Sequence, residues 1–272
     1  MATTITMSEA EIEAAMLAKI ENGEKLEPND PMTAEYRELL LNLLTMQADS
    51  ELSGGYGYIP WISQAPTIEE KLIVANIVRD EILHGKRMYK LLEDLGVEVD
   101  SRIRENDEAF LYRLDDNSAN IGTQRAKTDK RVNIFYYPIE TWTDFIMFNF
   151  CMDRGAGHQL HDALHCSYAP WARVTEQIFK EEVTHVAHGE KWVKKLAQDP
   201  ATREECQQTF NKWYLRTMNI FGRGNSPKNA LYRKYRLKLR DNDEVRDTFH
   251  REVVELVTKW GLTVPEWKPE NI

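Results

Sequence analysis

Residues 80–84, with the sequence DEILH, and residues 181–185, with the sequence EEVTH, each contain a Glu-x-x-His motif. Residues three apart in a helix lie on one face, so each motif presents a carboxylate and an imidazole together from adjacent turns. Both side-chain types are ligands of transition metals. The two stretches therefore mark two helices as candidate carriers of a metal site.

An acidic residue precedes each motif at nearly the same distance. Glu51 lies 30 residues before Glu81, and Asp153 lies 29 residues before Glu182. This repeat predicts two helix pairs that each give two carboxylates and one histidine to a shared site. The predicted fold is all-α, a ferritin-like four-helix bundle with a long crossover and additional C-terminal helices. Its predicted metal ligands are Glu51, Glu81, His84, Asp153, Glu182 and His185.

Periodicity supports this interpretation, because the motif alone is short and a chain of this composition contains roughly one match by chance. Apolar residues recur at helical spacing around both motifs, and the motif side chains share those apolar faces. Glu51 and Asp153 lie on apolar faces of their own segments. A charge on a buried face is costly unless it is paired or bound to a metal. The alternative is a set of buried Glu–His pairs without metal.

Composition narrows the class of protein. The chain has 272 residues, a mass of 31.8 kDa and a net charge of −9, which argues against nucleic acid as a partner. Its three cysteines form neither a zinc-site spacing nor a disulfide framework, which indicates a reducing compartment. The first 20 residues lack the apolar core of a signal peptide, and no apolar run is long enough to cross a bilayer. We expect a soluble cytoplasmic protein that binds no membrane.

The chain is expected to form three parts, an N-terminal arm (residues 1–32), a bundle domain (33–265) and a short tail (266–272). Within the domain, residues 97–140 are rich in charge and asparagine, with an apolar segment near residues 110–114. We interpret this segment as an excursion of short helix and loop that crosses from the first helix pair to the second.

Capping signals set the expected helix limits. Thr33 can cap the first long helix, and the glycine-rich segment 53–57 is expected to end it. Thr67, followed three residues later by Glu70, predicts a capping box at the start of the second. The predicted helices are 33–52, 67–95, 141–165, 170–198, 201–221 and 242–260.

Four carboxylates with two imidazoles favour iron or manganese over zinc, which takes fewer ligands and binds sulfur readily. Six side chains cannot saturate two metal ions, so open positions remain for O2 and a substrate. Our hypothesis is that two Fe(II) ions react with O2 and pass one oxygen atom to a substrate. In this hypothesis Glu81 and Glu182 bridge the ions, Glu51 and Asp153 are terminal ligands, and His84 and His185 bind one ion each.

Other polar residues offer competing interpretations. Three histidines share a predicted helical face that is either a metal site or a solvated surface: His158, His161 and His165. His188 with Glu181 could imitate the second motif in a shifted register, although the repeat favours the motif residues. Glu181 and Asp80 are interpreted as supporting or surface residues. The basic run 232–240 suits either a solvated helix face or a phosphate-bearing ligand or acidic partner.

Further short motifs lie outside the ligand pattern, among them Tyr36-Arg37, Trp61-Ile62, Ala65-Pro66-Thr67, Tyr137-Pro138, Ser167-Tyr168 and Asn225-Ser226-Pro227. Together with the mixed acid set, in which Asp153 takes the third position, they resemble the catalytic subunits of phenylacetyl-CoA epoxidases. Phe148, Arg154 and Gln159 lie in segments that are similar to the related benzoyl-CoA epoxidases. The resemblance extends over residues 33–267.

The resemblance implies an O2-dependent di-iron monooxygenase that epoxidises the ring of a phenylacetyl-CoA-like or benzoyl-CoA-like thioester in aromatic catabolism. Electrons would come from NADPH through a separate flavin and iron–sulfur reductase, so this chain would not bind NADPH itself. An oligomeric assembly and a homologous structural subunit are also implied. The positions that would line a CoA groove are Lys130, Arg131, Asn133, Asn219, Ser226, Lys228 and Lys238.

The chain also departs from the phenylacetyl-CoA epoxidase pattern. Its excursion is longer, its sequence stops soon after Pro265, and Ile77 stands where that family has a lysine near the metals. Asn42 and Met46 replace polar positions that contact CoA. The acyl group and the need for CoA therefore stay open. The alternatives are a di-iron oxygenase for a non-CoA aromatic compound and a non-catalytic scaffold subunit, which would have no reason to keep six buried polar residues.

Overall fold

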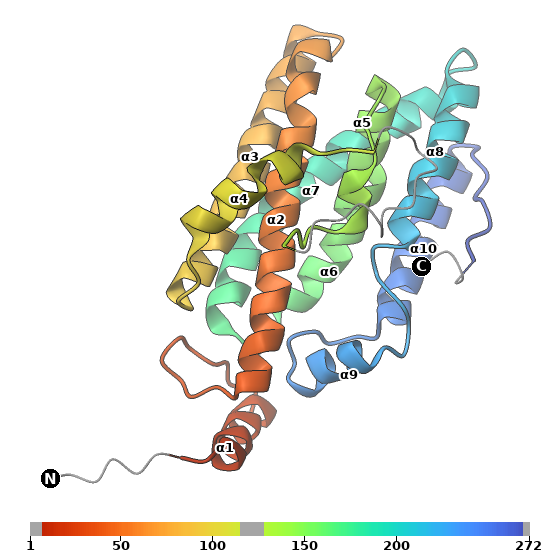
Figure 1. The fold of residues 1–272 in the computed structure, drawn as a ribbon. Helices are drawn as coiled ribbons and strands as arrows, with labels where there is room; N and C mark the ends of the chain where they lie inside the picture. The colour runs from red at the N-terminus through yellow and green to blue at the C-terminus, as the bar shows by residue number, and fades with distance from the viewer. Residues whose placement is uncertain (1–6, 115–127, 269–272) are drawn as a thin grey trace, which may run out of the picture.

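The computed structural model describes residues 7–114 and 128–268, and helices dominate this part of the chain (Figure 1). Within these residues the only β-type pairing is an isolated bridge between Leu26 and Tyr168. The predicted all-α class is therefore confirmed. None of the helices in the described ranges combines the length and apolar character that a bilayer crossing requires.

Four long helical segments form the bundle. The first pair is α2 (Ala34–Gln64) and α3 (Ile68–Asp94), which run antiparallel along their whole length (Figure 1). The third segment is continuous but is built from α5 (Trp142–Phe148), the π-helical turn η3 (Asn149–Asp153) and α6 (Arg154–Leu164). The fourth is α7 (Ala169–Gln198), which packs against both α3 and the third segment. This arrangement agrees with the ferritin-like bundle that the repeat predicts.

α2 does not end in its glycine-rich segment, so that prediction is wrong. The helix continues through residues 53–57 and Pro60 to Gln64. Its glycines keep a negative φ and serve close packing instead of a turn. A Cβ atom on Gly55 would lie 3.0 Å from Ile82 Cγ1, and one on Gly54 would lie 3.1 Å from Phe135 Cε1. The helix stops where the chain reaches residue 66, a proline, because the residue before proline disfavours helical geometry.

The caps of the first pair are partly as predicted. The Thr33 and Thr67 side chains accept hydrogen bonds from the backbone N–H groups of Tyr36 and Glu70. The second hydrogen bond of the capping box predicted at Thr67, from the Thr67 backbone to the Glu70 side chain, is not formed. The Glu70 carboxylate instead accepts a hydrogen bond from His188 Nε2 at 2.7 Å. Tertiary contact therefore overrides the local cap.

The crossover contains α4 (Val99–Leu111), which lies across α2 and α3, and the short 3-10 turn η2 (Asn133–Tyr136) (Figure 1). The predicted apolar segment near residues 110–114 forms the end of α4 and the chain after it. Residues 115–127 of the predicted excursion lie outside the described residues. The segment 128–137 returns to the bundle and packs beside α2.

Three helices follow the bundle: α8 (Arg203–Met218), α9 (Pro227–Lys234) and α10 (Asn242–Lys259). α8 and α10 pack on the third segment, and Tyr232 of α9 accepts a hydrogen bond from Asn42 of α2. The basic run 232–240 is not a helical face, because α9 ends at Lys234 and Arg236 has a φ of 50°. At the other end of the chain, α1 (Glu9–Glu21) buries Met16 and Ile20 in the same core cluster as residues of α2 and α7. The division into arm, domain and tail stays a prediction.

Candidate metal centre

All six residues of the predicted ligand set lie in the bundle interior. Glu51 comes from α2, Glu81 and His84 from α3, Asp153 from the end of η3, and Glu182 and His185 from α7. Glu51 is half-buried, and the other five residues are buried. Four separate helical segments therefore converge on one cluster of carboxylates and imidazoles.

The cluster divides into two overlapping groups whose candidate ligand atoms lie within 4.8 Å of one another. One group is Glu51, Glu81, His84 and Glu182, and the other is Asp153, Glu182 and His185. Glu182 belongs to both groups. Its Oε1 lies 3.1 Å from Nδ1 of His84, and its Oε2 lies 3.4 Å from Nδ1 of His185. One carboxylate thus faces both imidazoles, which is the position that a bridging ligand would occupy.

Glu81 lies on the opposite helix in a similar position. Its Oε1 is 3.3 Å from His185 Nδ1, although Glu81 and His84 share α3. Glu51 Oε2 lies 3.8 Å from His84 Nδ1 at the outer side of the first group. The motif glutamates therefore reach across the bundle toward the other motif, while Glu51 serves one group. This geometry is compatible with the predicted roles, which stay predictions.

The imidazole nitrogens and carboxylate oxygens of the cluster are arranged to bind cations rather than to hydrogen-bond with one another. Nδ1 of His84 and Nδ1 of His185 are buried without a hydrogen-bond partner in the described structure, and both point into the carboxylate cluster. Three buried acids and the half-buried Glu51, which face two imidazoles, carry an excess of negative charge that only bound cations or protons can offset. Oxygen-rich ligation with two nitrogens is the donor set that iron and manganese accept.

The pKa values show how strongly the metal-free cluster holds protons. Burial opposes the charged imidazole of His84, but Glu182 and Glu51 outweigh it and raise the pKa to about 11. Burial is likewise outweighed at His185, whose pKa is raised to about 12 by Glu182 and Glu81. Burial and the charge of Glu182 raise the pKa of Glu81 to about 8, and the same two causes raise that of Asp153. Bound metal ions would compete with these protons.

The residue before each motif glutamate lies near the histidine of the other motif. Glu181 Oε2 lies 2.8 Å from His84 Nε2, and Arg87 holds the same carboxylate. Asp80 Oδ2 lies 3.6 Å from His185 Nε2, which is too far for a hydrogen bond, and this nitrogen has no hydrogen-bond partner among the described residues. A carboxylate on Nε2 orients the ring and leaves Nδ1 free to face a metal. The supporting interpretation agrees with the Glu181 contact, whereas for Asp80 it stays a prediction.

The competing histidines have other partners. His188 bonds to Glu70 and not to Glu181, so the shifted register is not formed. His158 Nε2 lies 2.8 Å from Glu252 on α10. In the residues that the structure describes, neither these histidines nor His161 belongs to a group that could hold a metal.

Three polar neighbours of the cluster were not predicted as site residues. Asn149 donates to Asp153 Oδ2 at 3.0 Å, and the Tyr58 hydroxyl lies 3.4 Å from Oδ1. Gln47 donates to Glu51 Oε1 at 3.0 Å and accepts from Trp171 Nε1. Gln47 and Asn149 each precede a candidate ligand by four residues, so their place on the same helical face was the available signal.

A cavity opens from the cluster toward the outside. It holds about 1040 Å³ of empty space, its open mouth included. Glu51, Glu81, Asp153 and Glu182 line one part, and Lys238 also lines it. Most of the remaining wall is apolar, with contributions from α2, η3, α6, α7, the crossover and the chain after α8: Leu43, Met46, Val132, Phe135, Met152, Leu160, Trp171, Ile220 and Phe221. The carboxylate cluster is thus reached through an apolar chamber.

The positions predicted for a CoA groove are only partly brought together. Lys228 and Lys238 both lie near the Tyr232 ring, each with its amine 5.9 Å from the ring centre. Ser226 caps α9, and Asn219 accepts a hydrogen bond from Trp267 Nε1 at 2.8 Å.

The crossover members of this set lie elsewhere. Lys130 and Asn133 are exposed, whereas Arg131 is completely buried and engaged by protein groups. The Arg131 guanidinium therefore does not present an open face to a phosphate. A ligand-binding role for the remaining positions stays a prediction.

An all-helical bundle that buries overlapping groups of carboxylates and histidines belongs to the class of ferritin-like proteins with a candidate two-metal site. Comparison with known proteins agrees with this class. The family model described as Phenylacetic acid catabolic protein matches residues 7–271, and the chain belongs to this family.

Two relatives share long segments with the chain. It is 30% identical over 244 residues to one of the subunits of 1,2-phenylacetyl-CoA epoxidase from Escherichia coli (strain K12), covering 89% of this chain and 73% of the relative. It is 24% identical over 230 residues to benzoyl-CoA oxygenase component B from Aromatoleum evansii, covering 77% of this chain and 46% of the relative. The resemblance recognised in the sequence is therefore confirmed.

Proposed function

We propose that the protein is an O2-dependent di-iron monooxygenase that epoxidises the aromatic ring of an aryl-CoA thioester in aromatic catabolism. The observation that carries the proposal is the buried cluster, in which Glu182 faces both histidines, at the inner end of an apolar cavity. Relatives named as part of a phenylacetyl-CoA epoxidase and as a benzoyl-CoA oxygenase component support the substrate class. The precise acyl group is not part of the proposal.

The residues that would hold the two ions are the six predicted ligands, with Glu81 and Glu182 between the ions. When bound, iron would supply the activation of O2 and the transfer of one oxygen atom to the ring, and manganese is the second metal that suits the donor set. The other oxygen atom leaves as water, which requires two electrons and two protons. We propose NADPH as the electron source, through a separate flavin and iron–sulfur reductase.

The chain's own residues would orient the cluster and keep water away from it. Asn149 and Tyr58 donate hydrogen bonds to the two carboxylate oxygens of Asp153, one to each, and Gln47 donates to Glu51. Glu181 fixes the ring of His84. The apolar chamber would desolvate an aromatic ring beside these carboxylates, which favours binding of the ring and limits access of bulk water.

The position and charge of Lys238 favour a substrate that carries negative charge. Its side chain lines the cavity, and burial lowers the pKa of its amine, although Asp162 and Asp241 oppose this shift. Asp162 is already bonded to Arg240 at 2.7 Å. A phosphate of a CoA ester would give the Lys238 amine a partner of opposite charge, and Lys228 lies near the same tyrosine. An aromatic substrate without CoA is the second candidate, because only part of the predicted groove is assembled.

A scaffold role is the alternative from another class. Both relatives are named as parts of larger enzymes, so we also propose that this chain works with partner chains in an oligomer. A scaffold would not need six converging ligand residues, whereas a catalytic chain does.

The test is anaerobic reconstitution with Fe(II), followed by O2 consumption with a chemical reductant and either aryl-CoA esters or the matching free acids. We expect two iron ions per chain, O2 uptake that depends on a thioester, and incorporation of one atom of 18O into the ring. Protein that binds no iron would be a scaffold. Turnover of free acids but not of thioesters would remove CoA from the proposal and leave the oxygenase.

A further inference from the structure

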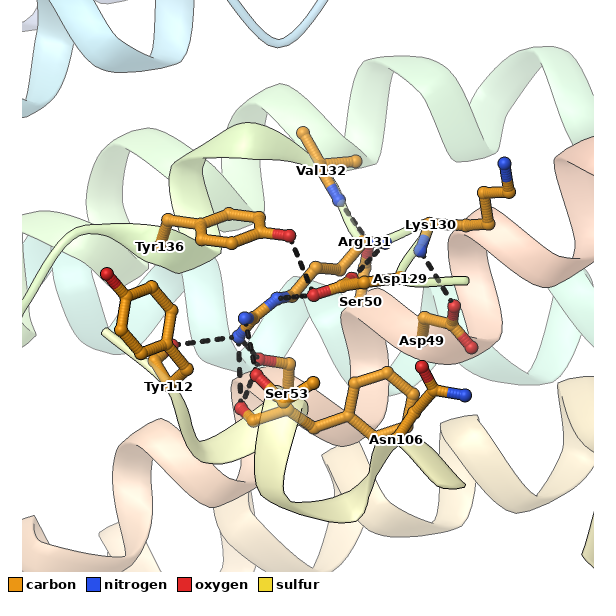
Figure 2. A network of polar contacts seen from close by, with 12 residues as sticks. Asp49, Ser50, Ser53, Asn106, Tyr112, Asp129, Lys130, Arg131, Val132 and Tyr136 are labelled. Carbon is orange, nitrogen blue, oxygen red and sulfur yellow. Dashed lines mark hydrogen bonds and ion pairs between the residues drawn. The ribbon is translucent and has the colours of Figure 1, made fainter. Parts of the chain in front are cut away.

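A buried ion pair between Arg131 and Asp129 lies in the crossover, next to α2 (Figure 2). Arg131 is fully buried, and its Nε donates to Asp129 Oδ2 at 2.9 Å. The Tyr136 hydroxyl donates to the same carboxylate oxygen at 2.7 Å, and the Arg131 guanidinium lies 4.0 Å from the centre of the Tyr136 ring. Breaking a buried pair leaves an uncompensated charge, so this arrangement is strongly favoured once formed.

Arg131 also joins three parts of the chain. Its Nη1 donates to Ser53 Oγ on α2 at 2.9 Å and to the carbonyl of Phe110 at 3.0 Å, and further bonds reach the carbonyls of Ala109 and Tyr112. These carbonyls belong to the C-terminal end of α4, where backbone acceptors lack helical partners and a cation is favourable. The guanidinium therefore ties α4 and the crossover to α2.

The neighbouring backbone is fixed on the same helix. Lys130 N donates to Asp49 Oδ2 at 3.1 Å, and Val132 N donates to Ser50 Oγ at 2.9 Å (Figure 2). Both acceptors directly precede Glu51 in α2. The backbone bonds of Lys130 and Val132, which flank Arg131, thus hold the following segment next to Glu51, a candidate metal ligand.

This anchored segment supplies two side chains to the cavity wall, Val132 and Phe135. Phe135 lies beside the metal cluster, because a Cβ atom on Gly54 would be 3.1 Å from its ring and 3.5 Å from Glu81 Oε2. The ring also packs against Phe148, with ring centres 5.7 Å apart. Phe135 is therefore wedged between α2, the third helical segment and the inner part of the chamber.

We infer that Phe135 is the residue that limits the size of the ring accepted beside the metal cluster, and that Arg131 and Asp129 are positioning residues that hold it there. The inference rests on the proposed function and names the side chain that would set a preference for a single unfused aromatic ring. In this arrangement a bicyclic ring would need part of the volume that the Phe135 side chain fills. A purely structural Phe135 would affect stability without changing the preference among ligands.

The experiment measures binding to metal-free protein by calorimetry, so that it does not depend on turnover. Phenylacetyl-CoA and 2-naphthylacetyl-CoA are titrated into the unaltered protein, Phe135→Ala and the milder Phe135→Leu. Phe210→Leu is the matched control, because Phe210 is also a buried phenylalanine, in α8, but does not line the cavity. We expect the preference for the single ring, taken as the ratio of the two Kd values, to fall by about tenfold in Phe135→Ala, less in Phe135→Leu, and not in Phe210→Leu.

The outcomes separate the inference from the proposed function. An unchanged ratio in both Phe135 variants, or an equal change in Phe210→Leu, would overturn the inference while leaving the oxygenase intact. If the unaltered protein binds neither thioester, CoA recognition fails, and the same ratio is measured with phenylacetate and 2-naphthylacetate. Iron-loaded protein should then show the same change in the ratio of kcat/KM values.

Discussion

The two halves of the bundle present the same ligand pattern on different backbones. The first half uses two regular helices, α2 and α3, which carry Glu51 and the first motif. The second half carries Asp153 at the end of the π-helical turn η3 and the second motif on the regular helix α7. Near equality of sequence spacing therefore does not require equality of local structure.

The position one turn after each motif histidine explains part of this difference. It is Met88 in the first half and Gly189 in the second. A Cβ atom on Gly189 would lie 2.5 Å from the backbone N of Phe150, within η3. The widened π turn can press against α7 only because that position has no side chain, and π turns of this kind often occur at functional sites. A shorter ligand, Asp153, sits on the half in which the backbones approach most closely.

Breaking the Asp129–Arg131 ion pair, in the crossover that connects the two halves, should have the largest effect on stability. Asp129→Ala leaves the buried Arg131 guanidinium without its anion, so we expect a loss of about 3–5 kcal/mol in the free energy of unfolding. Asp94→Ala is the control, because Asp94 pairs with Lys90 at the surface and should cost about 0.5 kcal/mol or less. Urea unfolding of metal-free protein measures both. Equal losses would show that the crossover is not anchored through this pair.

Gly189→Ala tests whether the second half depends on close approach to η3. The added methyl group meets backbone atoms that cannot rotate away, so we expect a loss of about 3 kcal/mol in the free energy of unfolding. Gly157→Ala on α6 is the matched control, because no atom lies within 4 Å of its Cβ position. That change should stabilise the protein by about 0.5–1 kcal/mol, since alanine favours a helix over glycine. A neutral Gly189→Ala variant would remove the contrast between the halves.

The two supporting carboxylates offer a direct comparison of the motifs. Glu181 approaches His84 at 2.8 Å, whereas Asp80 approaches His185 at 3.6 Å. Removing such a partner typically lowers metal affinity by about 10–100-fold, and we expect Glu181→Gln to lie at the upper end and Asp80→Asn at the lower end. Competition with a coloured chelator measures both affinities. The reverse order would mean that the closer contact does not control its histidine.

Acid should weaken metal binding in both halves. The raised pKa values of Glu81, His84 and His185, about 8, 11 and 12, mean that these groups hold protons at neutral pH in metal-free protein. Metal ions must displace those protons, so apparent affinity falls as pH falls, by about tenfold per pH unit for each proton displaced. Titration with Fe(II) or Mn(II) in weak buffer should release protons. A pH-independent Kd with no proton release would contradict the assigned ligands.

Sequence alone could predict the features that repeat along the chain. Helical periodicity around Glu81 and Glu182 was sufficient to place the bundle helices and to bring the candidate ligands to one interior. Glycine was ambiguous, because residues 53–57 could end a helix or permit close packing, and only the neighbouring Ile82 and Phe135 decide which.

Features that depend on a distant segment were not accessible from the sequence. The π turn depends on Gly189 from another helix, and no local pattern announces it. The resemblance to the phenylacetyl-CoA epoxidases placed Arg131 in a CoA groove by its position in the sequence. The burial of Arg131 against the end of α4 depends on tertiary contacts with residues 20 or more positions away.

The central prediction is that Glu182 contributes a ligand to both metal positions, whereas Glu51 and Asp153 contribute to one each. Iron content after anaerobic reconstitution tests it in the unaltered protein, Glu182→Ala, Glu51→Ala and Asp153→Ala, with helical content checked by circular dichroism. The account predicts two tightly held ions per unaltered chain, fewer than one in Glu182→Ala, and about one in each of the other two variants. A folded Glu182→Ala protein that still holds two iron ions would contradict it.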